Sequence, residues 1–194
     1  MPRRPRHQEP GAYYHVVARG NNKQLIFDDE LRRLFLNLVK LASATYDWRV
    51  LAFALMRNHY HLVLKIGDPG LSDGMWALNT RFAKASNSRF GRINHCLGRR
   101  FWSAQLETEH YLLSSVRYCY WNPPRARICA EPSDSTWTSY RASVGLDQPH
   151  PVVAQSELLA LFDANPAHAR RALSGFVAEG RVRCQAPWDG PPSR

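Results

Sequence analysis

The chain has 194 residues, of which 44% are hydrophobic, so it is long and apolar enough to form one domain with its own core. Its formal charge of +10 favours polyanionic partners, nucleic acids first, because binding them releases condensed counterions. The sequence has no run of about 18 apolar residues and no apolar segment behind its basic N-terminus, which argues against a membrane-spanning helix and a secretory signal. We therefore expect a soluble, cytoplasmic protein.

Arginine and cysteine usage narrow the class further. Almost all of the positive charge comes from arginine, whose planar guanidinium binds phosphate in two places and stacks on bases. A genome rich in G and C would also favour arginine over lysine, but it would not explain the net charge. The cysteines form no CxxC pair, so we expect reduced thiols rather than a zinc knuckle or a disulfide framework.

The pattern from residue 12 to residue 66 predicts a strand, a helix and a β-hairpin. Residues 12–20 alternate in polarity and end in a Gly-Asn-Asn turn. Residues 28–47 have an acidic first turn and apolar side chains at helical spacing, namely Leu31, Leu34, Phe35, Leu38 and Leu41. Residues 48–56 and 59–66 are two apolar runs with only two residues between them, which is typical of a tight antiparallel hairpin.

The pattern from residue 71 to residue 122 predicts a helix, a strand and a further helix. Residues 71–91 suit a helix capped by Ser72, with a core face made of Met75, Leu78, Phe82 and Ala85. Residues 100–109 suit a fourth strand, and residues 110–122 a third helix that ends at two prolines. This order indicates an α+β fold, a ferredoxin-like antiparallel sheet with helices mainly on one face.

Composition divides the chain into three parts. Residues 1–11 form a basic N-terminal arm, residues 12–145 the main domain, and residues 146–194 a linker, a helical appendage and a Pro-rich tail. The linker is indicated by GLDQPHPVV, and the appendage by SELLALF and PAHARRALSGFVAEGR.

The first candidate site residues are His59 and His61, at the start of the second arm of the predicted hairpin. Because successive side chains of a strand point to opposite faces, the two imidazoles share one face and Tyr60 points to the other. Two adjacent imidazoles can hold a metal ion, although strand histidines of this kind are often simply solvated or hydrogen-bonded to a neighbour.

The third predicted helix adds Tyr118 and Asn122, which share one face because they lie four residues apart. The Asn122 amide oxygen would complete a His, His, Asn set for a divalent ion, with open positions for phosphodiester oxygens. A metal that withdraws charge from the phosphorus makes attack by the Tyr118 phenol feasible. Tyr118 also suits an ordinary helix core and Asn122 a helix cap, but the combination with the hairpin and the charge favours function.

Three segments resemble, in order, the signature blocks of the single-tyrosine, HUH-type transposases, in particular their REP-associated tyrosine transposase branch. They are AYYHVVARGNN, LAFALMRNHYHLVLKI and YLLSSVRYCYWNPPRAR, and TWTSYRA at 136–142 is also similar to the family. The resemblance covers about residues 10–145. It implies a ferredoxin-like fold and a Mg²⁺- or Mn²⁺-dependent endonuclease acting on single-stranded DNA. It also implies a covalent 5′-phosphotyrosine intermediate and a free 3′-hydroxyl that can reverse the cleavage.

Carried over by position, the resemblance makes His59 and His61 the metal-binding histidines, Tyr118 the nucleophile and Asn122 the third metal ligand. Tyr120 is the alternative nucleophile, two residues away but about 200° around the helix. The family commonly has Asn-Pro-Val-Arg-Ala after the nucleophile, whereas this chain has NPPRA, whose second proline should stiffen the exit from the helix. The segment NHCLGRRFW (94–102) matches the family only loosely, so no base-reading residue is carried over from it.

Relatives in this branch act on palindromic repeats that fold as hairpins, so the resemblance implies single-stranded and hairpin DNA as the substrate. Arginines of the N-terminal arm and of the approach to the metal are expected to bind this DNA: Arg3, Arg4, Arg6, Arg99, Arg100, Arg125 and Arg127. The arm equally suits a solvated tail. Phe101 and Trp102 lie nearby for base stacking, although Trp102 also suits the core.

Two other hypotheses compete with a nuclease. A non-catalytic regulator would keep the fold and the arginines and would bind hairpin DNA equally well in EDTA. A structural zinc site at His59 and His61 would lack the usual cysteine partners. Some relatives are dimers that exchange the tyrosine helix, but this chain shows no obvious spare hydrophobic face, so we expect a monomer.

Overall fold

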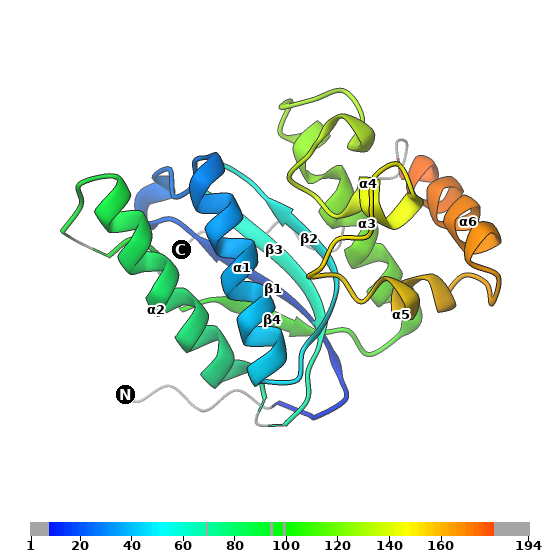
Figure 1. Cartoon of the computed structure of the whole chain (residues 1–194), viewed down its shortest axis with the longest axis horizontal. Coiled ribbons are helices and arrows are strands. Elements are labelled where there is room, and N and C mark those ends of the chain that lie inside the picture. Colours follow the sequence, from blue (N-terminus) through cyan, green and yellow to red (C-terminus); the bar gives the residue numbers. More distant parts are fainter. Residues whose placement is uncertain (1–7, 69, 94, 99, 181–194) are drawn as a thin grey trace.

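A four-stranded antiparallel sheet forms the centre of the computed structural model, which describes residues 8–68, 70–93, 95–98 and 100–180 (Figure 1). The strands lie in the order β2-β3-β1-β4. Their bounds are β1 Tyr13–Arg19, β2 Arg49–Leu55, β3 His59–Lys65 and β4 Trp102–Gln105. With the two helices that connect them, the strands have the β-α-β-β-α-β order of a ferredoxin-like fold, so the predicted fold class is confirmed.

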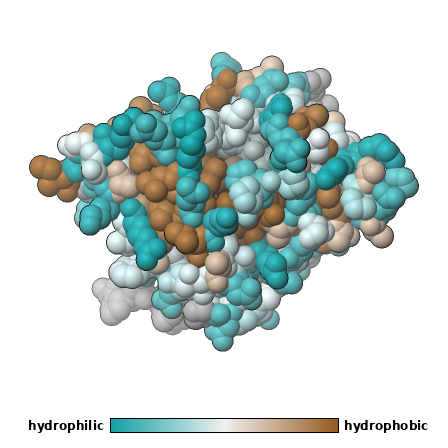
Figure 2. Space-filling model, in the orientation of Figure 1, coloured by the Kyte–Doolittle hydropathy of each residue, from teal (hydrophilic) through white to brown (hydrophobic). Residues whose placement is uncertain are grey.

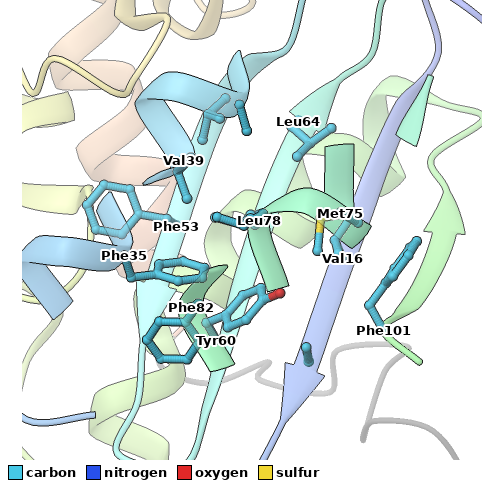
Figure 3. Packing of buried hydrophobic residues seen from close by; sticks show 14 of the residues in the cluster. Val16, Phe35, Val39, Phe53, Tyr60, Leu64, Met75, Leu78, Phe82 and Phe101 are labelled. Atoms are coloured by element: carbon cyan, nitrogen blue, oxygen red, sulfur yellow. The ribbon is translucent and has the colours of Figure 1, made fainter. Parts of the chain in front are cut away.

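Helices α1 (Asp29–Thr45) and α2 (Leu71–Arg89) lie side by side across one face of the sheet (Figure 1). Aromatic rings from both layers meet between them, as Figure 3 shows for Phe35, Tyr60 and Phe82. The ring centroid of Phe35 lies 4.4 Å from that of Tyr60 and 5.1 Å from that of Phe82. Burial of such a side chain stabilises the fold by about 1.5–3 kcal/mol, so this core fixes the sheet firmly.

Side-chain oxygens cap both of these helices. Asp28 precedes α1, and its carboxylate accepts a hydrogen bond from the backbone N–H of Leu31 over 2.8 Å. Gln8 caps α2 from far away in the sequence, because its Oε1 accepts from the backbone N–H groups of Leu71 and Ser72 over 2.7 and 2.9 Å. The prediction that Ser72 caps this helix is wrong, since Ser72 lies inside the helix and its hydroxyl accepts from the Gln8 amide.

The buried face of α1 is rotated from the predicted one. Leu31 and Phe35 are buried as predicted, but Leu34 and Leu41 are 36% and 54% exposed. Their places in the core are taken by Leu36, Val39 and Ala42. Figure 2 shows hydrophobic side chains at the surface over the layer of α1 and α2, so the apolar residues of α1 exceed what the sheet can cover.

Helix α3 (Glu109–Arg125) packs on the opposite face of the sheet, against β2 and β3. The prediction that Pro123 and Pro124 end this helix is wrong, because both lie inside its last turn. Arg125 continues the helix after the prolines, and the N–H of Ala126 donates to the Asn122 carbonyl over 3.0 Å. The turn therefore closes beyond the prolines.

The C-terminal helices complete a second core on the α3 side. They are α4 (Tyr140–Val144), α5 (Gln155–Ala160) and α6 (Pro166–Glu179), and the short 3₁₀ turns η1 (Asn21–Lys23) and η2 (Pro132–Asp134) lie earlier in the chain. Leu51, Ala54 and Val63 of the sheet are fully buried in this core. Helices therefore cover both faces of the sheet rather than mainly one, because the second face is also apolar and needs cover.

The predicted parts of the chain correspond only partly to described residues. The linker and the helical appendage are residues 146–154 with α5 and α6, whereas residues 1–7 of the arm and residues 181–194 of the tail lie outside the described residues. Among the described residues, no helix combines the length and the apolar character that crossing a bilayer requires. Cys96, Cys119 and Cys129 are free thiols, in keeping with their spacing.

Gly74 lies where α2 packs on Trp48, and a Cβ there would lie 2.3 Å from Cζ2 of that ring. We expect Gly74→Ala to lower the free energy of unfolding by about 1–3 kcal/mol, because overpacking outweighs the roughly 1 kcal/mol that alanine gains in a helix. Gly175→Ala in α6 is the matched control, since no atom lies within 4 Å of its added Cβ, and it should raise the free energy of unfolding. Urea denaturation measures both, and equal effects would contradict the packing argument.

Candidate active site

His59 and His61 lie on β3 and face away from the core under α1 and α2. Their ring centroids are 5.0 Å apart, and His61 is only 3% exposed. Tyr60 between them points to the other face, where it is fully buried and its hydroxyl donates to Asn79 Oδ1 over 2.6 Å. The alternation of the strand thus places the two imidazoles together, as the sequence predicted.

Tyr118 and Asn122 reach the histidines from α3. The ring centroid of Tyr118 lies 5.3 Å from that of His61. The Asn122 side chain hydrogen-bonds the His59 ring, and its Nδ2 donates to the backbone carbonyl of Tyr118 over 3.5 Å. The sheet and the helix of one chain therefore bring the four predicted residues together.

Tyr120, the alternative nucleophile, lies in the second core. It is fully buried, and its hydroxyl donates to Ser143 Oγ over 3.1 Å. Burial raises the pKa of this phenol above its ordinary value. Its ring packs against Tyr140, so the structure separates the two tyrosines and brings only Tyr118 to the histidines.

His15 belongs to the same cluster, although it is not among the site residues predicted from the sequence. Strand β1 pairs with β3 so that Val17 lies opposite His61 and His15 opposite Val63, which puts His15 on the face of the two histidines. Its Nε2 lies 3.0 Å from Nδ1 of His61, and its side chain is 1% exposed. Alternation in AYYHVVARG could have indicated the face of His15, but its contact depends on a register that the sequence does not reveal.

Two arginines lie beside this cluster. Arg125, a predicted DNA-binding residue, has its guanidinium carbon 5.2 Å from the centroid of the Tyr118 ring. Arg19 was not predicted, and it is the exposed register partner of His59 at the end of β1. Burial is the main cause of the lowered pKa of His59 and of His61, and the charge of Arg19 is a smaller one for both rings.

Other predicted DNA-binding arginines lie elsewhere or cannot be placed. Arg100 lines a groove of about 950 Å³ between α2 and residues 93, 95–98, 100 and 101, and none of the four predicted site residues lines this groove. Arg127 is exposed just after α3, in a left-handed backbone conformation with φ of 56°. The remaining four, Arg3, Arg4, Arg6 and Arg99, lie outside the described residues.

The two aromatic residues expected to stack on bases point in different directions. Phe101 is 7% exposed and packs in the core under α1 and α2, so it is not available for stacking (Figure 3). Trp102 is half-buried and makes an edge contact with His15, their ring centroids lying 5.7 Å apart. Trp102 therefore forms one wall of the histidine cluster.

Burial keeps the histidines of the cluster neutral. Loss of solvent lowers the pKa of His15 and of His59 to about 4, and Arg19 adds to the effect at His59, while hydrogen bonding of the protonated His59 ring to the Asn122 side chain opposes it. The pKa of His61 is lowered well below its ordinary value, first by burial and then by the neighbouring His15, His59 and Arg19. Neutral imidazole is the form that binds a metal ion.

The donor set fits a divalent metal ion. Nε2 of His61 is buried and has no hydrogen-bond partner among the described residues, and a metal ion bound there would satisfy it. His59, His61 and Asn122 offer two imidazole nitrogens and one amide oxygen, which leave coordination positions for phosphate oxygens. In the described part of the chain, no three His, Cys, Asp or Glu side chains are grouped to hold a metal, so the zinc hypothesis gains no further ligand.

A model of the family described as "Transposase IS200 like" matches residues 9–116, which is more than half of the chain. The chain belongs to this family. The resemblance inferred from the sequence is therefore confirmed at the level of the family. His59 and His61 of this IS200-like transposase lie within the matched residues, whereas Tyr118 and Asn122 follow just after them.

Two solved structures resemble the fold of this IS200-like transposase. A REP-associated tyrosine transposase bound to a REP hairpin matches it with a TM-score of 0.64 at 16% sequence identity, over 78% of this chain and 90% of that chain. A structure described as a candidate transposase from Deinococcus radiodurans R1 matches with a TM-score of 0.43 at 16% identity, over 56% and 88% of the two chains. No curated protein matches the chain. The first structure shows that the two chains share a fold.

The buried histidines make stability dependent on pH. Their pKa values in the folded state lie below 6.5, so the unfolded chain binds protons first as the pH falls. The free energy of unfolding without metal should be fully present above about pH 6.5 and should decrease towards pH 4, by roughly 1.4 kcal/mol per pH unit for each such histidine. Urea unfolding in EDTA measures this decrease. His15→Phe removes one histidine and should make the decrease less steep, so an unchanged slope would contradict the assignment.

Proposed function

We propose that this IS200-like transposase is a metal-dependent single-stranded DNA endonuclease and strand transferase that cleaves beside hairpin DNA through a covalent 5′-phosphotyrosine. The observation that carries the proposal is the meeting of Tyr118 with His59, His61 and Asn122 from separate elements. Tyr120, the alternative nucleophile, lies in the core, where its hydroxyl donates to Ser143. Geometry and family thus support the same residue.

Cleavage exchanges one phosphate ester for another. The Tyr118 hydroxyl oxygen attacks the phosphorus, the bond between phosphorus and the 3′ oxygen breaks, and the 5′ phosphate stays on the tyrosine. The phenol loses a proton and the 3′ oxygen gains one, so the step balances. A divalent ion held by His59, His61 and Asn122 would supply charge that stabilises the phosphate and the departing oxygen. Attack of a 3′-hydroxyl on the phosphotyrosine reverses the step and joins strands.

The cations beside the cluster suit the phosphate backbone. Arg19 lies at the end of β1 next to His59, and Arg125 lies over the Tyr118 ring, so positive charge flanks the reacting groups on two sides. Guanidinium groups bind phosphate oxygens in two places and can orient the ester for attack. The similar fold in a transposase bound to a REP hairpin supports a hairpin with an adjoining single strand as the substrate class.

Tyr118→Phe should abolish a denaturation-resistant adduct between the protein and a hairpin oligonucleotide with a single-stranded flank, formed in Mn²⁺. The phenyl ring keeps the packing but lacks the attacking oxygen. Tyr120→Phe is the matched control and should keep the adduct, because the lost hydroxyl bonds only within the core. Denaturing gel electrophoresis of a labelled oligonucleotide measures the yield over a panel of hairpins. An equal adduct in Tyr118→Phe would reject the nucleophile, and DNA binding without any adduct would support a non-catalytic regulator.

Arg19→Ala should slow cleavage by about 10- to 100-fold, because a charge-assisted hydrogen bond to phosphate contributes about 1.5–3 kcal/mol. Arg33→Ala on the exposed side of α1 removes the same charge on the other face of the sheet and serves as the control. Single-turnover cleavage rates at saturating protein measure the difference. Equal rates for the two variants would show that only the net charge of the protein matters.

A further inference from the structure

Each of the two site histidines has its Nδ1 nitrogen held by a neighbour. For His59 the neighbour is Asn58, whose Oδ1 lies 2.7 Å from Nδ1. The orientation of this amide is fixed, because its Nδ2 donates to the Lys23 carbonyl over 3.1 Å. An amide oxygen only accepts hydrogen bonds, so Nδ1 of His59 carries the proton and Nε2 keeps its lone pair.

For His61 the neighbour is His15. The bond between His61 Nδ1 and His15 Nε2 has a length of 3.0 Å, and both side chains are buried. If His61 donates, its Nε2 keeps a lone pair toward the site, whereas if His15 donates, Nε2 of His61 carries a proton and cannot bind a metal. Nε2 of His61 is the buried nitrogen that lacks a partner, so a metal there selects the first arrangement.

The ring of His15 is fixed by its surroundings. Its centroid lies 5.7 Å from that of Trp102 and 5.9 Å from that of Tyr118, both in edge contacts. Its remaining nitrogen, Nδ1, has no hydrogen-bond partner in the part of the chain that the structure describes, so the bond to His61 is the one that orients the ring there. A histidine packed in this way on three aromatic or imidazole rings keeps its acceptor nitrogen aimed at one atom.

We propose that Asn58 and His15 are positioning residues that hold His59 and His61 with the proton on Nδ1, so that both Nε2 lone pairs point at one divalent ion. The inference rests on the proposed metal site and assigns roles to two residues outside the His, His, Asn, Tyr set. Partners of this kind fix ring orientation and the protonated nitrogen, and their loss typically costs about 10- to 100-fold in metal affinity.

Mn²⁺ binding to the full-length protein, followed by electron paramagnetic resonance without DNA, tests the proposal. His15→Phe keeps the size of the ring but removes the acceptor, and it should weaken Mn²⁺ binding about 10- to 100-fold. His15→Gln returns an oxygen at the reach of Nε2 and should restore most of the affinity. His110→Gln, at an exposed position on α3, is the control for loss of a histidine and should bind as the unaltered protein does.

A second pair of variants tests the partly exposed Asn58, where substitution does not disturb the core. Asn58→Ala removes the acceptor and the bond to the Lys23 carbonyl, whereas Asn58→Asp removes that bond, adds a negative charge and keeps an oxygen for His59 Nδ1. We expect weakened Mn²⁺ binding in the alanine variant and retained binding in the aspartate variant. Equal weakening in both would overturn the role of Asn58, because it would trace the effect to the Lys23 contact.

The protonated nitrogen can also be observed directly. Nitrogen-15 correlation spectra of the imidazoles should show Nδ1–H for His59 in the metal-free protein and for His61 once the diamagnetic ion Mg²⁺ is bound, and His15→Phe should leave His61 in a mixture of both forms. A folded His15→Phe protein with undiminished Mn²⁺ binding and an unchanged His61 spectrum would overturn the proposal for His15. Absence of Mn²⁺ binding in the unaltered protein would instead reject the metal site, and with it the proposed function.

Discussion

The pairing of β1 with β3 is the constraint on which the rest of the structure depends. One register sends Val16 and Tyr60 into the core under α1 and α2 and puts His15 and His61 together on the other face. A slip of one residue would place imidazoles among the buried aromatic rings and would expose those rings. The packing of the large apolar core therefore also fixes the positions of His15 and His61 on the other face of the sheet.

The rotation of α3 decides which tyrosine meets the histidines, and the C-terminal helices help to set it. Trp121 donates from Nε1 to the Val177 carbonyl of α6 over 2.7 Å, and Tyr120 donates to Ser143 of α4. These two anchors lie between Tyr118 and Asn122 in the sequence but on another side of the helix. The predicted appendage thus supplies one of the two anchors, the Val177 carbonyl, for the helix that carries the proposed nucleophile.

The parts of the candidate site that depend on residues close together in the sequence could be predicted. Alternation in β3 put His59 and His61 on one face, and helical spacing put Tyr118 beside Asn122, and both patterns are short-range. His15 and Arg19 were missed because their contacts come from a register between strands far apart in the chain. The same reason explains the wrong cap of α2, where Gln8 arrives from a distant segment, and the rotated face of α1, which has more leucines than the core accepts.

The proposed set of metal ligands explains why the rings of His59 and His61 need to be held firmly by their neighbours. Two neutral imidazoles and an amide, the proposed ligands, would leave the full charge of a divalent ion available to a phosphodiester, and Arg19 and Arg125 lie nearby with further positive charge. Such a set binds the ion more weakly than carboxylates would, because it offers no opposite charge. Affinity would then come from preorganisation, with both rings already oriented before the ion arrives. The bonds that Asn58 and His15 make to the two rings provide that preorganisation, and burial removes the protons that would compete with the metal.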